Sequence, residues 1–109
     1  MFGRYEILIP VFSNDGKRFD STVVDVFRDT CLDLFDGYTQ NPTTFRGVWR
    51  DTDTGIVYDE DMNMFYVYSD TESKVYDLAR NATVIFDQVA ISVTKPGGIS
   101  VLIYHPYKS

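Results

Sequence analysis

The first strand of this chain is predicted by an alternating pattern close to the N-terminus. Every second residue from Tyr5 to Val11 is apolar, which is the period of a β-strand. The positions between them are also largely apolar, which suits a strand covered by helices on at least one side. Pro10 has no backbone N–H, so we expect it at an edge, a bulge or the end of the strand. Asn14-Asp15-Gly16 then predicts a turn.

A helical period replaces the alternation after residue 20. Apolar side chains then recur at steps of three and four, at Val24, Phe27, Cys31 and Leu34. Asp20 or Ser21 is expected to cap the start of this helix. Gly37 is expected to end it in a left-handed conformation, which favours glycine.

A second amphipathic helix is predicted after residue 69. Ser69 and Glu72 match a capping box, with Ser69 as the N-cap and Glu72 as the third helical residue. The apolar stripe that follows consists of Val75, Leu78, Ala79, Ala82, Ile85, Phe86 and Val89.

The rest of the sequence favours short strands. Residues 38–69 lack a helical period and predict two or three antiparallel strands, around residues 45–50, 56–58 and 64–68, with a turn at DTDTG. An acidic stretch, Asp59-Glu60-Asp61, separates the last two of these predicted strands. Residues 90–93 and 99–104 then predict a hairpin around TKPGG.

This order of elements predicts one α+β domain over residues 1–109. It fits the ferredoxin-like, or split βαβ, plan: a two-layer sandwich with two helices on one face of an antiparallel sheet, here with an extra C-terminal hairpin. The other face must be solvated or covered. Because eight Tyr and eight Phe exceed what a small core needs, we expect a homo-oligomer, most simply a twofold dimer.

The charge of the chain narrows the classes of partner. The net charge is −6, and the sequence has no basic stretch that would replace counterions on a nucleic acid or an anionic membrane. No apolar run reaches 18 residues, and no signal peptide is visible, so we expect a cytoplasmic protein that binds neither nucleic acid nor membrane.

The titratable residues do not form a known catalytic or metal motif. Asp51, Asp53 and Gly55 resemble the start of a calcium loop, but the sixth and twelfth positions are Ile56 and Met62, where that loop needs Gly and Glu. The only histidine, His105, has no apparent acid–base partner in the sequence. Cys31 lies on an apolar stripe and is expected to be inert. We therefore expect no catalytic residues, no metal and no cofactor.

Aromatic residues and arginines give the strongest indication of a site. In a strand over residues 45–50, Phe45, Gly47 and Trp49 share one face, and Gly47 leaves a notch between two large rings. Arg46 and Arg50 share the other face, where they either bind a small anionic ligand or pair with surface carboxylates such as Asp59 to Asp61. The candidate binding residues are Tyr38, Thr39, Phe45, Gly47, Trp49, Arg50 and Tyr58.

The sequence also resembles a group of small bacterial proteins of unassigned function. Their shared pattern is "IPV…D..G", then "FGGYT", then "G.WRD…G.VY.D". The matching residues are Ile9 to Val11 with Asp15 and Gly16, Phe35 to Thr39, and Gly47 to Asp51 with Gly55, Val57, Tyr58 and Asp61. Asp36 replaces the first glycine of the pair. The resemblance implies an α+β domain and brings no catalytic residues with it.

Three functions are consistent with these patterns. The leading hypothesis is a homo-oligomeric module that binds a small ligand or a protein partner near Trp49. The second is a small cofactor-independent enzyme of the dimeric ferredoxin-like type, for which Tyr38, Asp51 and Tyr58 are the best acid–base groups. The third is an acidic inhibitor or antitoxin-like protein that covers a basic partner.

Overall fold

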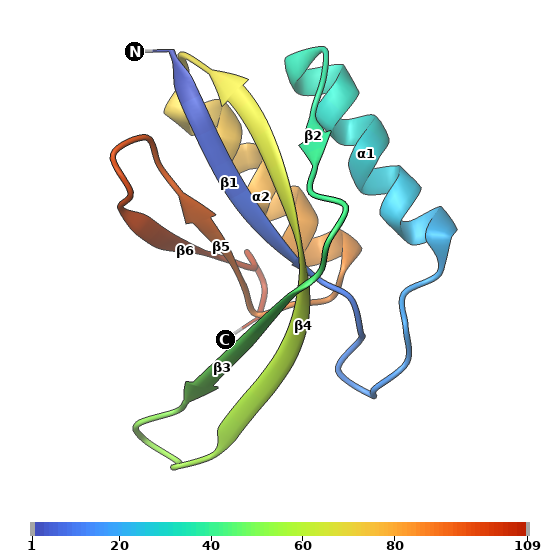
Figure 1. Ribbon diagram of the computed structural model, residues 1–109, viewed down its shortest axis with the longest axis vertical. Coiled ribbons are helices and arrows are strands. Elements are labelled where there is room, and N and C mark those ends of the chain that lie inside the picture. Colours follow the sequence, from blue (N-terminus) through green and yellow to red (C-terminus); the bar gives the residue numbers. More distant parts are fainter. Residues whose placement is uncertain (1, 109) are drawn as a thin grey trace.

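The computed structural model describes residues 2–108 and forms two layers, a six-stranded antiparallel sheet and two helices that pack on one of its faces (Figure 1). The elements are β1 (Gly3–Pro10), α1 (Ser21–Phe35), β2 (Thr39–Gln40), β3 (Phe45–Arg50), β4 (Val57–Ser69), α2 (Glu72–Ile85), β5 (Ala90–Thr94) and β6 (Ser100–Tyr104). The strand order is β2-β4-β1-β5-β6, and β3 also pairs with β4. This confirms the predicted ferredoxin-like plan, including the C-terminal hairpin.

The long strand β4 has different neighbours along its two halves. From Met62 to Ser69 it pairs with β1, and β2 pairs with it at Phe65 and Tyr66. From Val57 to Met62 it pairs with β3 and forms a hairpin that extends beyond the end of β1. The acidic residues 59–61 lie inside this strand, so the predicted break between two separate strands is wrong. Asp59 and Asp61 are exposed and Glu60 is partly buried, so water still solvates these carboxylates.

The core lies between the sheet and the helices. Alternate residues of β1 point toward the helices, and Ile7 and Ile9 are fully buried. Phe27 of α1 meets Phe65 of β4 edge to face, with ring centroids 5.0 Å apart. Cys31 is also fully buried, so the predicted apolar stripe of α1 does face the core. Pro10 is the last residue of β1, where its missing N–H costs no sheet hydrogen bond.

The structure confirms the predicted start of α1 but not its predicted end. The Asp20 carboxylate accepts a hydrogen bond from the Thr22 N–H at 2.9 Å, which confirms Asp20 as the N-cap. The left-handed residue at the other end is Asp36, with φ 60°, and not Gly37. Aspartate tolerates this conformation better than most residues. The helix therefore ends one residue earlier than predicted.

The predicted capping box of α2 is wrong. The N-cap is Thr71, and Glu72 is the first helical residue instead of the third. The Ser69 hydroxyl accepts a hydrogen bond from the Thr71 N–H at 2.9 Å, so it stabilises the turn before the helix. Asp87, with φ 52°, follows the end of the helix and leaves Val89 outside it.

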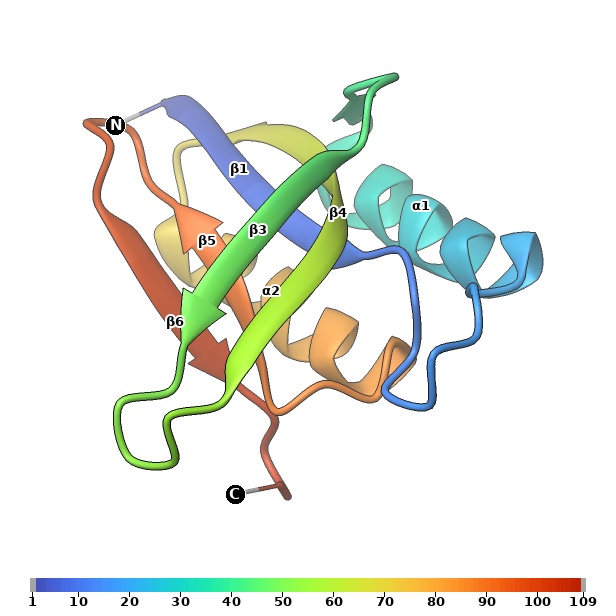
Figure 2. The same ribbon diagram turned by 60° about the horizontal axis from the view of Figure 1, so that its bottom comes forward.

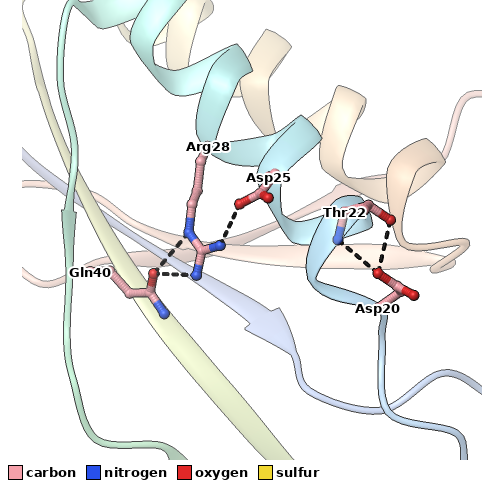
Figure 3. A network of polar contacts seen from close by, with 5 residues as sticks. All are labelled: Asp20, Thr22, Asp25, Arg28 and Gln40. Carbon is pink, nitrogen blue, oxygen red and sulfur yellow. Dashed lines mark hydrogen bonds and ion pairs between the residues drawn. The ribbon is translucent and has the colours of Figure 1, made fainter.

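A polar network joins α1 to the edge of the sheet (Figure 3). The Arg28 guanidinium donates to the Gln40 side-chain oxygen in β2, at 3.2 Å from Nε and 2.9 Å from Nη2. It also donates to Asp25, at 2.8 Å from Nη1. Arg28 therefore anchors the short strand β2, which has only two residues of its own to pair with β4.

Candidate binding site on the helix-free face

A hollow of about 770 Å³ opens on the face of the sheet that carries no helix. Its walls are the β3–β4 hairpin on one side and the β5–β6 hairpin on the other, and β1 forms its floor. Figure 2 shows the sheet from its helix-free side, with α2 behind it. We call this the Trp49 hollow, and its principal residues are Trp49, Asp51, Tyr58, Glu60, Leu102 and Tyr104.

Two stacked aromatic rings form the hairpin wall. Trp49 of β3 lies directly opposite Tyr58 of β4, so their side chains leave the same face of the sheet. The ring centroids are 4.6 Å apart and the planes differ by 17°. Trp49 remains 51% exposed in spite of this stack. An indole that is held on one side and open on the other is a ready surface for a flat or cationic group.

Glu60 lies beside this aromatic pair. It pairs across the strands with Gly47, and its Oε2 atom lies 3.5 Å from the indole Nε1 of Trp49, at the outer limit of a hydrogen bond. A Cβ atom built on Gly47 would contact only the Glu60 carbonyl oxygen, at 3.9 Å, which is an ordinary contact. The backbone therefore does not require glycine at position 47.

Asp51 lies at the rim of the Trp49 hollow, where β3 passes into the hairpin turn. Its Oδ1 atom accepts hydrogen bonds from the Asp53 N–H at 2.8 Å and from the Thr54 N–H at 3.2 Å. Gly55, with φ 75°, completes the turn. These contacts hold the Asp51 carboxylate in place, and no Lys, Arg or His of residues 2–108 forms an ion pair with it.

The opposite wall comes from residues that the sequence did not indicate. Leu102 and Tyr104 of β6 are 55% and 58% exposed and line the hollow. They alternate along β6 with the partly buried Val101 and Ile103, whose side chains pack against the core. This alternation along β6 could have predicted that Leu102 and Tyr104 face away from the core. It does not show which other strand lies across from them.

The structure brings together only some of the predicted site residues. Trp49 and Tyr58 line the hollow, and so does Asp51, one of the predicted acid–base groups. Tyr38 instead packs beside Phe65 at the core, with ring centroids 5.8 Å apart. The remaining predicted residues, Thr39, Phe45, Gly47 and Arg50, do not line the hollow.

The two arginines of β3 lie on the opposite face from Trp49, as predicted. Arg46 forms a two-point contact with Asp59, with Nε 2.8 Å from Oδ1. This hydrogen bond raises the pKa of Arg46 and lowers that of Asp59. Of the two alternatives for Arg46, pairing with a surface carboxylate is therefore the one observed. None of the residues that line the hollow is an arginine, so the hollow itself does not provide the small anionic ligand of the other alternative with an arginine partner.

The remaining titratable residues have structural surroundings. Burial raises the pKa of the Cys31 thiol to about 12. The His105 ring accepts a hydrogen bond at Nδ1 from the Tyr107 N–H, 3.0 Å away, within the C-terminal tail. Among residues 2–108, no group of three or more His, Cys, Asp or Glu side chains is close enough to hold a metal ion.

The described part of the chain also has no helix that is both long and apolar enough to cross a membrane.

Two carboxylates that the hypothesis of an acidic inhibitor relies on, one in α1 and one in β4, have cationic partners. Asp25 of α1 pairs with Arg28, and Asp59 of β4 pairs with Arg46. These pairs offset part of the negative charge that the hypothesis of an acidic inhibitor requires on one surface.

Comparison with known proteins identifies relatives in fold only. No protein-family model matches the sequence, and no curated protein matches it. The structure is similar to a phage SAM lyase in complex with S-methyl-5'-thioadenosine, with 17% identity over 99% of this chain and 92% of the lyase and a TM-score of 0.69. A phage SAM lyase in the apo state gives 16% identity over the same shares and a TM-score of 0.71. The divalent cation tolerance protein CutA1 from Thermus thermophilus gives 12% identity over 93% of this chain and 82% of its own, with a TM-score of 0.60. At these identities the likeness shows a shared ferredoxin-like fold.

Proposed function

We propose that this protein is a homo-oligomeric ferredoxin-like module that binds a small organic ligand in the Trp49 hollow. The observation that carries the proposal is the hollow itself, which is lined by an exposed indole stacked on Tyr58 and by the apolar and aromatic residues of β6. Its volume of about 770 Å³ lies within the range of roughly 300–1,000 Å³ that is typical of ligand pockets. A mostly apolar lining with a few polar groups is also typical of such sites.

The homo-oligomeric part rests on apolar surface outside the hollow. Phe2 and Tyr68 stack on each other at 6.2 Å on the helix-free face and are 68% and 49% exposed. Arg4 lies over the ring of Tyr66 on the same face, at 4.8 Å from the ring centroid. Monomers rarely leave large aromatic surfaces exposed to water. A second copy of the chain, related by a twofold axis, is the simplest cover.

Light scattering tests the oligomer. We expect at least a dimer at micromolar concentration, and Tyr68→Lys is expected to shift the mass toward the monomer because it places a charge in the covered surface. Arg80→Lys, which keeps the charge on an exposed helix position, is the control. A strict monomer in the unmodified protein would overturn this part of the proposal.

Fluorescence tests the ligand site, because Trp49 is the only tryptophan. S-methyl-5'-thioadenosine is the first probe, since a phage SAM lyase of the same fold holds it. Binding in the hollow is expected to change the Trp49 emission, and Tyr104→Ala is expected to weaken that change. If neither this nucleoside nor the charged and neutral probes described below change the Trp49 signal, the proposal of a ligand site is overturned.

A second candidate is an enzyme of the ferredoxin-like type. It is favoured by one observation: Asp51, Tyr58 and Glu60 line a single hollow, where acid–base groups would have to meet. Tyr38, the third group expected for this function, lies elsewhere. Incubation with S-adenosylmethionine, followed by mass spectrometry for its loss, tests this candidate. It fails if the loss equals that seen with an Asp51→Asn, Glu60→Gln double variant.

A further inference from the structure

We infer that the ligand of the Trp49 hollow is an organic cation, with an ammonium group attached to an apolar body. The inference deepens the proposed function and rests on it. The charge is opposite to that of the small anionic ligand that was one of the two alternatives for Arg46 and Arg50.

The charged groups of the hollow all have the same sign. Asp51 and Glu60 line it, and none of its lining residues is Lys, Arg or His. Arg46 and Arg50 are directed to the other face of the hairpin by the alternation of β3, and Arg46 is held there by Asp59. A ligand that enters the hollow therefore meets two carboxylates and no protein cation.

Both carboxylates are half-buried and keep an oxygen available. Asp51 uses Oδ1 for its turn, and Glu60 directs Oε2 to the Trp49 indole at 3.5 Å. Within residues 2–108, Asp51 Oδ2 and Glu60 Oε1 accept no intramolecular hydrogen bond. Charge-assisted hydrogen bonds to such oxygens are stronger than neutral ones, which favours a ligand with N⁺–H donors.

Three aromatic rings line the same space. Trp49, Tyr58 and Tyr104 present π faces or edges to the hollow, and Trp49 and Tyr104 are more than half exposed. The face of an aromatic ring attracts a cation, and rings gathered around a pocket are the usual means of recognising ammonium groups. The aromatic and acidic groups therefore favour the same ligand charge.

The lining favours an organic cation over a metal ion. Calcium takes about six to eight oxygen ligands, whereas the hollow offers two carboxylates and the neutral side chains of Asn14, Gln88 and Ser92. Its apolar walls include Leu8, Met62 and Leu102. These walls instead provide contact for a hydrocarbon body.

Three probes that share one ring and differ in charge test the inference: phenethylamine, 2-phenylethanol and phenylacetate. Binding is followed by the NMR signal of the single indole N–H, which belongs to Trp49 and so reports on the hollow. We expect phenethylamine to bind about tenfold more tightly than 2-phenylethanol, from cation–π attraction and a charge-assisted hydrogen bond. Phenylacetate is expected to bind more weakly than either.

Variants assign the preference to the hollow. Glu60→Gln and Asp51→Asn keep the side-chain shapes and remove one charge each, so each is expected to reduce the preference for phenethylamine over 2-phenylethanol. Asp29→Asn removes the same charge from an exposed position on α1 and is expected to leave the preference unchanged. Because the comparison is a ratio within one variant, a general loss of affinity does not imitate the result.

The outcomes separate the inference from the function on which it rests. Equal or tighter binding of the alcohol or the carboxylate at Trp49 overturns the inference and keeps the hollow as a ligand site. A preference that persists unchanged in both hollow variants also overturns it. If none of these probes and no S-methyl-5'-thioadenosine shifts the Trp49 signal, the proposed function itself fails.

Discussion

The two halves of β4 belong to one continuous strand but have different surroundings. In the C-terminal half, Phe65 and Val67 are fully buried between the sheet and the helices, and β1 and β2 flank the strand. In the N-terminal half, residues 57–60 pair with β3 alone, and no helix covers either face. Tyr58 and Glu60 of this half line the Trp49 hollow.

The difference shows that the two halves of one strand have different roles. Burial of apolar side chains is the main favourable term in folding, so the covered half contributes most of the stability. The side chains of the uncovered half form a surface that is open to solvent. Changes in the first half should therefore affect unfolding, and changes in the second should affect binding.

The largest expected effect comes from truncating a matched pair of aromatic residues on β4. Phe65→Ala removes a fully buried ring that packs on Phe27, and we expect it to lower the free energy of unfolding by about 3–5 kcal/mol. Tyr58→Ala removes a partly exposed ring, and we expect a loss of about 1 kcal/mol or less. Urea denaturation, followed by circular dichroism, measures both. Equal losses of unfolding free energy would refute this difference between the two halves of β4.

A smaller effect is expected from the ion pair on the uncovered half. Arg46 holds the pKa of Asp59 below its ordinary value of 3.8, so the pair stabilises the fold above that pH. The stabilisation is lost as the pH falls through the lower pKa of the folded state. We expect Asp59→Asn to lower the melting temperature slightly at pH 7 and by less at acid pH.

Salt provides the control for this ion pair. Because both side chains are exposed, 1 M NaCl is expected to shrink the difference at pH 7. A difference that grows toward acid pH would contradict the assigned direction.

The smallest effect is expected at Gly47. Its φ is not positive and a Cβ atom would fit, so Gly47→Ala is expected to leave stability unchanged or to raise it by less than about 1 kcal/mol. Gly97→Ala is the matched control, because φ 98° strains an L-residue and should lower stability. A clear loss at position 47 would show that the open space between Phe45 and Trp49 is needed.

The periodic segments of the sequence predicted most of the fold. The alternation near Tyr5 and the helical stripe through Phe27 each reflect one buried face. A buried face produces a regular spacing of apolar residues, which a short stretch of sequence shows clearly. The ends of the helices were less predictable, since Asp36 and Gly37 are both able to adopt the left-handed conformation and Ser69 competes with Thr71 for the turn before α2. Local sequence does not decide between such neighbours.

Only one wall of the Trp49 hollow was predicted. Trp49 and Tyr58 lie in the same hairpin, so a single segment indicated both. Leu102 and Tyr104 reach the hollow from more than 40 positions further along the chain, through the order of strands in the sheet. The acidic side of the hollow was not predicted for a related reason: alternation placed the arginines away from Trp49, but only the structure showed Asp51 and Glu60 lining the same hollow.

The burial of Cys31 has a practical consequence for labelling. It is the only cysteine, it is fully buried, and its thiol has a pKa of about 12, so maleimides at neutral pH should leave the folded protein unmodified. A cysteine introduced at the exposed Val48 would then be the single attachment point for a dye or spin label, with no need to remove the native thiol. Distances measured from that label would report on the hairpin directly, in solution and one molecule at a time.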